Sequence, residues 1–316
     1  MSSSHGKKIL TVFGATGNQG GSVINAVLND PELSNQYTVR AITRDISNPV
    51  VQTMKAKGAE IVQADLDVPS TLPAALSNAH TLFLMTNTTY TSSTKATETR
   101  QAKAVLDLAV SLGIEYVIWS SMSHPYRISK GALQHVEHFD VKAEIETYIR
   151  TLPLKSAFFA PGSFMQNLHA SMRPRPLSDG SGKYGWFNNL QPSTLMPLID
   201  ITDTGKWIAA ILSSPSTYEG KFFAAAERLY SVKEIVDIMS KVTGKEIVHV
   251  RVEDEAYNGW LPEGFREELG EMMVLVRDYG YFGEGMERDV AWAREQVRGE
   301  VRGLEEFLRQ EPLGLE

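Results

Sequence analysis

Three glycines, Gly14, Gly17 and Gly20, follow an apolar, β-branched segment at residues 7–13 and precede a helical pattern. At this spacing the first glycine permits a tight turn after a strand, the second lets backbone amides approach a pyrophosphate, and the third lets the next helix pack closely on the sheet. The helix N-terminus adds free N–H groups and a positive dipole end. The loop therefore predicts a dinucleotide-binding site, whose expected residues are Gly14, Thr16, Gly17, Asn18, Gln19 and Gly20.

A second strand pattern, residues 37–42, ends in Thr43 and Arg44. In a βαβ unit this end faces the adenosine ribose, where an acidic side chain accepts from the 2′-hydroxyl and an arginine binds a 2′-phosphate. Arg44 therefore favours NADP(H) over NAD(H). Without the glycine loop upstream, Arg44 would be interpreted as a solvated loop residue.

Polar side chains follow the later strands of this half of the chain. Because open α/β sheets bind ligands at the carboxyl ends of their strands, we expect Thr86 and Asn87 to contact the cofactor. Asp65 either accepts from the adenine amino group or caps the helix that follows it. Ser121 either donates to a substrate carbonyl or caps the next segment.

Strand and helix patterns that alternate along the chain must position these residues. Further strands are expected at residues 60–64, 80–85, 115–119 and 155–159, and helices at 22–28, 70–76, 94–112 and 136–148. This alternation predicts an α/β fold, a Rossmann-type doubly wound parallel sheet.

The pattern changes after residue 152. We interpret residues 1–152 as the NADP(H)-binding domain, with a sheet completed by later strands. Residues 153–316 then form a smaller C-terminal α+β module for a substrate or partner, interleaved with that sheet. Within it, residues 178–195 predict a hairpin flap, because three glycines separate short β-like pieces.

Composition restricts the class of protein. The net charge of −7 argues against a nucleic-acid-binding surface. The absence of cysteine excludes disulfides, a thiol nucleophile and a zinc-thiolate site, and no metal is expected. The first six residues lack an apolar signal core, and no apolar run is long enough to span a bilayer. We therefore expect a cytoplasmic protein, with the nucleus as a further location.

Four segments together resemble the NmrA-like family. They are G-A-T-G-N-Q-G (14–20), V-R-A-I-T-R (39–44), G-A-E-I-V-Q-A-D-L-D (58–67) and H-F-D-V-K (138–142). The family comprises atypical members of the short-chain dehydrogenase/reductase superfamily, and the phenylcoumaran and isoflavone-type reductases are its neighbours. The resemblance covers essentially the whole chain and implies NADP(H) binding.

His138 and Lys142 are four residues apart on an expected helix and therefore share one face. Ordinary members of the superfamily carry a tyrosine where His138 stands. The resemblance implies that Lys142 contacts the nicotinamide ribose and serves as a general acid or base, and a protonated His138 is a further proton donor. Each residue also has an ordinary interpretation: Lys142 as a solvated lysine on a helix, and His138 as a helix residue near the site.

Three residues of the second half are candidates for a substrate pocket. The resemblance places Phe164 and Asn167 beside the substrate. Trp186 belongs to the expected flap and either lines the pocket or packs in the core, which is the commoner environment of such aromatics.

Two functions are consistent with these features. One is an NADPH-dependent reductase of a small organic substrate, favoured by the retained Lys142. The other is a catalytically silent NADP(H) redox sensor that regulates a transcription factor or another protein partner, favoured by the missing tyrosine. We favour the reductase, because a sensor has no evident need for aromatic residues beside the nicotinamide.

Overall fold

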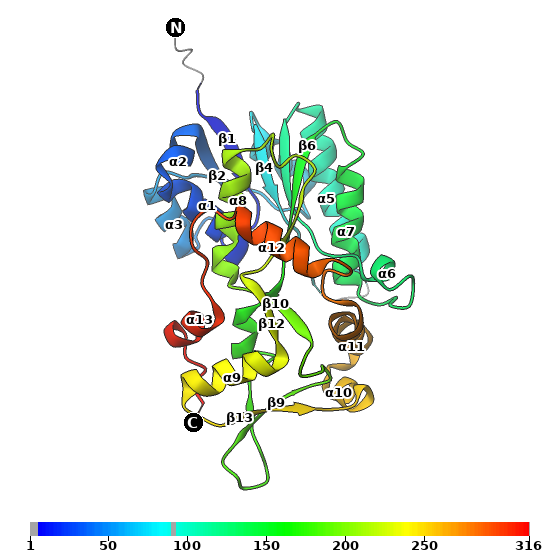
Figure 1. Cartoon of the computed structure of the whole chain (residues 1–316). Coiled ribbons are helices and arrows are strands. Elements are labelled where there is room, and N and C mark those ends of the chain that lie inside the picture. The colour runs from blue at the N-terminus through cyan, green and yellow to red at the C-terminus, as the bar shows by residue number, and fades with distance from the viewer. Residues whose placement is uncertain (1–5, 90–92, 316) are drawn as a thin grey trace.

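A seven-stranded parallel sheet organises the protein, in the order β11-β6-β5-β4-β1-β2-β3 (Figure 1). The computed structural model describes residues 6–89 and 93–315, so most of the N-terminal segment 1–6 considered above lies outside the described part. The strands of this sheet are β1 Lys8–Val12, β2 Tyr37–Thr43, β3 Glu60–Gln63, β4 Thr81–Leu84, β5 Tyr116–Ser120, β6 Lys155–Pro161 and β11 Phe222–Ala225. The predicted fold class is confirmed. The six strands predicted for this sheet differ from the observed ones only at their ends, whereas the edge strand β11 was not predicted.

Alternate side chains of each strand enter opposite hydrophobic layers. On β5, Tyr116 and Ile118 pack into one layer, whereas Val117 and Trp119 pack into the other. Both sets are buried, which is the reason that the strands of a parallel sheet are apolar nearly throughout.

Helices cover both faces of the sheet. One face carries α1 Asn18–Asn29, α2 Pro31–Gln36, α3 Pro49–Ala56, α8 Thr204–Ser213 and α12 Met286–Gln296. The other face carries α4 Leu72–Leu76, preceded by η1 Pro69–Thr71, together with α5 Thr94–Ser111 and α7 Glu137–Ile149. The short α6 Pro125–Ile128 lies between β5 and α7 in the chain. Two covered faces make the sheet doubly wound.

The second half of the chain contributes to two structures. Its β6, β11, α8 and α12 join the large sheet, and the remaining elements build a smaller α+β part around a separate core (Figure 1). One small sheet contains β12 Arg228–Ser231, β10 Leu195–Ile199 and β7 Ser163–Phe164, and the other contains β13 Ile247–Arg251, β9 Tyr184–Asn188 and β8 Arg175–Pro176. The helical elements are α9 Val232–Thr243, α10 Asp254–Trp260, α11 Arg266–Val274 and α13 Leu304–Gln310, with the short turns η2 Met165–His169, η3 Ile201–Asp203, η4 Glu263–Phe265 and η5 Leu275–Tyr279.

The expected hairpin flap is smaller than the sequence indicated. The observed hairpin pairs β9 with the two-residue strand β8, which precedes the expected range. Strand β9 also pairs in parallel with β13, and β10 belongs to the other small sheet. The segment is therefore fixed by long-range strand pairing, which its glycine pattern did not indicate.

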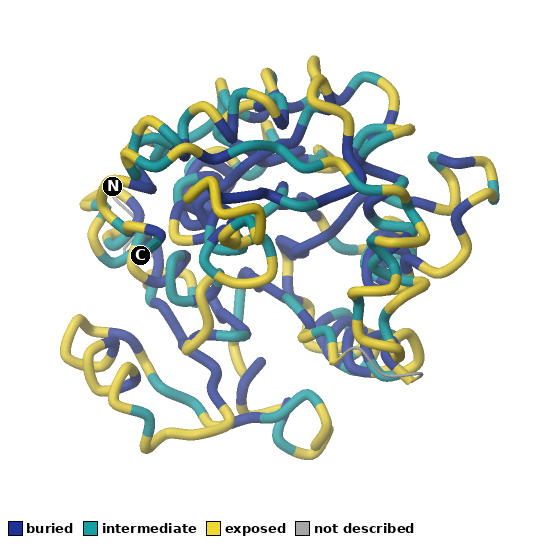
Figure 2. The backbone as a smooth tube through the Cα atoms, turned by 90° about the horizontal axis from the view of Figure 1, so that it is seen from below, coloured by how far each residue is buried: buried dark blue, intermediate teal, exposed yellow. Residues whose placement is uncertain are grey.

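Burial follows these layers. Figure 2 shows buried backbone through the central strands and exposed backbone along the outer helices and loops. Within residues 6–89 and 93–315, no helix combines the length and the apolar character needed to cross a membrane.

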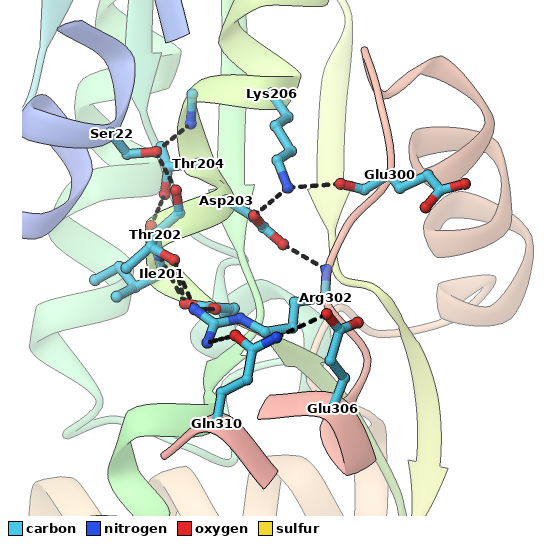
Figure 3. Close-up of polar contacts among 12 residues, drawn as sticks. Ser22, Ile201, Thr202, Asp203, Thr204, Lys206, Glu300, Arg302, Glu306 and Gln310 are labelled. Atoms are coloured by element: carbon cyan, nitrogen blue, oxygen red, sulfur yellow. Dashed lines mark hydrogen bonds and ion pairs between the residues drawn. The ribbon is translucent and has the colours of Figure 1, made fainter. Parts of the chain in front are cut away.

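The segment between α12 and α13 is bound to the turn before α8 (Figure 3). The backbone N–H of Arg302 donates to the carboxylate of Asp203 at 2.7 Å, and the Arg302 guanidinium pairs with Asp200. Lys206 bridges Asp203, at 2.6 Å, and the carbonyl oxygen of Glu300, at 2.5 Å. These contacts hold the C-terminal segment against the Rossmann-type layer.

Candidate functional site

The glycine loop has the geometry that its sequence predicts. Gly14 adopts a φ of +68°, in the left-handed region that favours glycine, and its carbonyl oxygen accepts from the N–H of Gly17 at 2.9 Å. A Cβ on Gly20 would lie closer than 3.0 Å to that same carbonyl oxygen. Helix α1 therefore packs on the turn at a distance that only glycine permits.

The same loop leaves donors for an external anion. Thr16, Gly17 and Asn18 are exposed. Gly17 is the N-cap of α1, and within the described residues no side chain caps this helix end. The first amides of α1 thus remain free to bind phosphate oxygens, so the residues present fit a dinucleotide.

The loop is joined to the end of β5 by one side-chain contact. The hydroxyl of Ser120 donates to Oε1 of Gln19 at 2.8 Å. Gln19 is thereby fixed by its side chain while its backbone remains in the first turn of α1. The contact places the carboxyl end of β5 beside the glycine loop.

Arg44 is exposed directly after β2, as expected for a 2′-phosphate ligand. Hydrogen bonds from Gln101 and Arg100 lower the pKa of the nearby Asp67 carboxyl, and the charge of Arg44 acts in the same direction. Arg100 and Asp67 lie 2.6 Å apart. Two guanidinium groups therefore stand near one carboxylate at the adenosine end of the expected site.

Asp65 takes part in a turn. Its Oδ1 accepts from the N–H of Asp67 at 3.0 Å, and its own N–H donates to the hydroxyl of Thr71 at 3.0 Å. The Asp65 side chain closes this turn, but among the described residues no side chain caps η1 or α4, so the capping interpretation is wrong. The contact with adenine stays a prediction.

Lys142 is held at the carboxyl edge of the sheet by three elements. Its Nζ donates to Oε2 of Glu98 on α5 at 2.6 Å and to the carbonyl oxygen of Thr86, after β4, at 3.2 Å. Its own carbonyl oxygen accepts from the indole N–H of Trp119 on β5 at 2.9 Å. Both the backbone and the ammonium of Lys142 are therefore fixed.

Glu98 forms the acidic half of this pair. Its side chain is 1% exposed and that of Lys142 is 14% exposed. The hydroxyls of Thr86 and Thr88 also donate to its two oxygens. Burial lowers the pKa of Lys142, and the charge and hydrogen bond of Glu98 oppose that effect.

Sequence reasoning missed Glu98, although a signal was present. On α5, Glu98 lies on the same inward stripe as Thr94, Ala102 and Val105, all of them buried. A carboxylate on the buried face of a helix requires a partner, because an unpaired buried charge is costly. That observation alone does not identify Lys142 as the partner.

His138 contacts a residue that the sequence did not suggest. Its Nδ1 lies 2.5 Å from Oε1 of Glu268 on α11, and the same oxygen accepts from the N–H of His138 at 3.0 Å. Burial acts to raise the pKa of Glu268, but the hydrogen bond and charge of His138 more than offset it, so that this pKa is lowered. His138 therefore joins α7 to the C-terminal part.

Ser121 is not exposed at the edge of the sheet. Its side chain is fully buried, and its hydroxyl donates to Oε2 of Glu146 on α7 at 2.6 Å. In this structure Ser121 packs β5 against α7 and offers no group to a substrate.

The three candidates for the substrate pocket lie in different environments. Phe164 on β7 and Asn167 in η2 are half-buried. Asn87, expected to contact the cofactor, is exposed. Trp186 is 2% exposed, belongs to the second core, and donates its indole N–H to the carbonyl oxygen of Met172 at 2.8 Å. Trp186 therefore packs in the core and does not line a pocket.

The fold and the glycine loop define the class of the protein as Rossmann-type, with a glycine turn between β1 and α1. The chain belongs to the NmrA-like family, whose profile matches residues 6–308. The resemblance seen in the sequence is thereby confirmed.

Similar proteins cover most of the chain. An NmrA-like family domain-containing protein of Dictyostelium discoideum is 26% identical over 96% of this chain and 97% of its own length. An NmrA-like family domain-containing oxidoreductase of Aspergillus campestris, cpsB, is 30% identical over 78% of this chain and 76% of its own length.

Solved structures share the fold. NmrA, described as a negative transcriptional regulator and solved with NADP, superposes with a TM-score of 0.80 at 23% identity, covering 97% of this chain and 96% of that one. The triphenylmethane reductase of a Citrobacter species gives a TM-score of 0.74 at 20% identity, covering 96% and 98%.

Proposed function

We propose that the protein is an NADPH-dependent reductase of a small, electron-poor organic substrate. The observation that carries the proposal is the buried Lys142 ammonium, fixed by Glu98 at the edge of the sheet to which the glycine loop also belongs. Relatives named as oxidoreductases support it, and so does the triphenylmethane reductase, which has been solved with NADP(H).

Each expected binding residue has a defined task. The amides at the start of α1 would hold the pyrophosphate, Arg44 the 2′-phosphate, and Lys142 the nicotinamide ribose. Thr86 and Asn87 follow β4 beside Lys142, and Phe164 and Asn167 are the residues expected near the substrate. When bound, the nicotinamide supplies the hydride.

Lys142 is the group that we assign to proton transfer. The pKa of its ammonium is lowered by burial, which brings it nearer to the range in which proton transfer at neutral pH is efficient. His138 is a weaker candidate, because its Nδ1 is bound to Glu268.

A spectroscopic assay tests the proposal. NADPH oxidation is followed at its absorbance maximum with a panel of enones, quinones and aldehydes, for the wild-type protein and for Lys142→Met. We expect the variant to lose about 10²- to 10⁴-fold in rate. The control is Lys95→Met, because Lys95 pairs with Glu144 in an exposed position on the same two helices. A wild-type protein that binds NADPH and oxidises it with none of these compounds would refute the reductase.

A second function, a catalytically silent NADP(H) redox sensor, is favoured by one observation. The residue in the place of the usual tyrosine, His138, is engaged by Glu268 and joins α7 to α11. The structural neighbour NmrA is described as a regulator. A sensor requires different structures with NADP⁺ and NADPH, so hydrogen exchange in α7 and α11 should differ between the two complexes. Identical exchange would exclude this alternative.

A further inference from the structure

Glu98 is the most deeply buried acid of the site, and the function proposed above uses it only as the partner of Lys142. Its two oxygens accept from Lys142 and from the hydroxyls of Thr86 and Thr88, so the whole carboxylate is satisfied within the protein. These partners come from α7 and from the loop after β4. Glu98 therefore lies between the helix that carries Lys142 and the loop expected to contact the cofactor.

We propose that Glu98 is a positioning residue, which fixes the ammonium of Lys142 against the loop at residues 86–88 and keeps it charged for the nicotinamide ribose. The inference rests on the proposed function, because it assigns Lys142 to the cofactor. Glu98 is 1% exposed on its side chain and acts through Lys142.

Among residues 6–89 and 93–315, Glu98 is the carboxylate that the ammonium of Lys142 contacts. Other ionisable side chains on the neighbouring turns have partners elsewhere: His138 is bound to Glu268, and Glu146 to Arg150 and Ser121. The second ion pair between α5 and α7 joins Lys95 to Glu144 and is exposed. The loop after β4 and strand β5 contribute hydroxyl, carbonyl and indole groups to Lys142 and Glu98, and these groups do not titrate near neutral pH.

Removal of the carboxylate should therefore favour the neutral amine. A buried ammonium without a counter-charge loses its proton at lower pH, because burial disfavours the charged form. A protein with Glu98→Gln would then have to take up a proton at Lys142 when a ligand requires the ammonium. The number of protons exchanged on binding reports this change directly.

Titration calorimetry with NADP⁺ measures it. The binding enthalpy is determined in two buffers of different ionisation enthalpy across the pH range, which gives the protons taken up per nucleotide. Proton uptake on binding should begin at a lower pH in Glu98→Gln than in the wild-type protein, with a difference of about one pH unit or more. Glu98→Asp should restore the wild-type profile in part, because it keeps the charge.

A double substitution shows whether Glu98 acts through Lys142. In the Lys142→Met background the titrating amine is gone, so the double variant with Glu98→Gln, which retains neither member of the pair, should show no proton uptake from Lys142. This background also removes the unpaired buried charge, so it provides a folded protein if Glu98→Gln alone does not fold. Glu144→Gln is the control for loss of an acid between α5 and α7.

The outcomes separate this proposal from the proposed function. Superimposable proton profiles of the wild type and Glu98→Gln, with nucleotide bound in both, would overturn the role of Glu98 and leave the reductase standing. A shifted profile without turnover of any substrate would keep Glu98 and reject the reductase. The absence of binding heat with the wild-type protein would overturn both.

Discussion

Pairing decides what the individual ionisable residues of this site can do. The ammonium of Lys142 is buried against Glu98, whereas Arg44 is exposed at the end of β2. A buried pair is fixed and sensitive to the loss of either partner. An exposed arginine keeps its donors available for a ligand, which is the property that phosphate recognition requires.

Arg44→Ala should weaken the binding of NADP(H) more than that of NAD(H). Loss of a charge-assisted contact to the 2′-phosphate costs about 1.5–3 kcal/mol, or about ten- to a hundredfold in affinity. Calorimetry with both coenzymes measures the ratio. Arg288→Ala, an exposed arginine on α12, is the control. Equal losses for the two coenzymes would remove the phosphate assignment.

Contacts between elements determine the geometry of the site. Helix α1 approaches the turn after β1 so closely that a Cβ on Gly20 would overlap the backbone of Gly14. The amides that face an anion are therefore placed by the packing of a helix on a strand.

Gly20→Ala should displace the start of α1. Because the overlapping atoms belong to the backbone, the added methyl group should lower the free energy of unfolding by about 1–3 kcal/mol. Nucleotide binding should be lost as well. Urea unfolding and calorimetry provide the two measurements. In the control Gly259→Ala, on α10, the new Cβ meets no atom within 4 Å, so binding should stay unchanged and the free energy of unfolding should not fall. A Gly20→Ala protein with normal affinity would contradict the assigned role of the loop.

Helix α11 caps the N-terminal end of α7 from a distance in sequence. Glu268 accepts from the N–H of His138, and Glu271 accepts from the N–H of Gln134 and of His135. Each carboxylate also contacts the imidazole of its histidine partner. The position of the helix that carries Lys142 is therefore coupled to the C-terminal part.

His135 gives this junction a pH dependence. Its hydrogen bond to Glu271 raises the pKa of His135, so the folded state holds the proton more tightly than the unfolded state. That stabilisation is fully present below the unfolded pKa and is lost as the pH rises through the folded pKa.

His135→Gln should therefore lower the melting temperature more at about pH 6 than at about pH 9. Differential scanning calorimetry at both pH values measures the difference. For the control His249→Gln the sign should reverse, because burial lowers the pKa of His249. If His135→Gln lowers the melting temperature equally at both pH values, the ion pair of His135 with Glu271 contributes nothing to stability.

At the scale of the whole molecule, the C-terminal segment returns to the Rossmann-type layer. Arg302 pairs with the fully buried Asp200 and with Glu311, and Figure 3 shows its guanidinium between the turn before α8 and α13. The smaller α+β part is thus anchored to the sheet by a chain segment as well as by its own strands.

Arg302→Met should destabilise the whole protein. It leaves the carboxylate of Asp200 buried without its counter-charge, which costs about 3 kcal/mol or more. Equilibrium unfolding in urea tests this value. The exposed Arg309, paired with Glu305 one turn away, is the control, and Arg309→Met should leave the unfolding midpoint unchanged. Equal midpoints for the two variants would refute the anchoring role.

The sequence by itself determined the features that depend on neighbours in the chain. The glycine spacing at Gly14, Gly17 and Gly20 specified the turn, because backbone conformation and close approach are local requirements. The apolar runs specified the parallel strands, since both faces of such a sheet are buried. The family followed from the same short segments.

Only the tertiary structure decided the partners of the buried polar residues. Glu98 and Lys142 are separated by 44 residues, and Glu268 and His138 by 130. The sequence placed Trp186 on an expected flap, but in the structure its strand β9 pairs with β13 and the side chain is buried. A charge or an indole is compatible with many environments, and which one it occupies depends on the elements that pack around it. The local pattern determines the element, and the packing of distant elements determines the chemistry of its side chains.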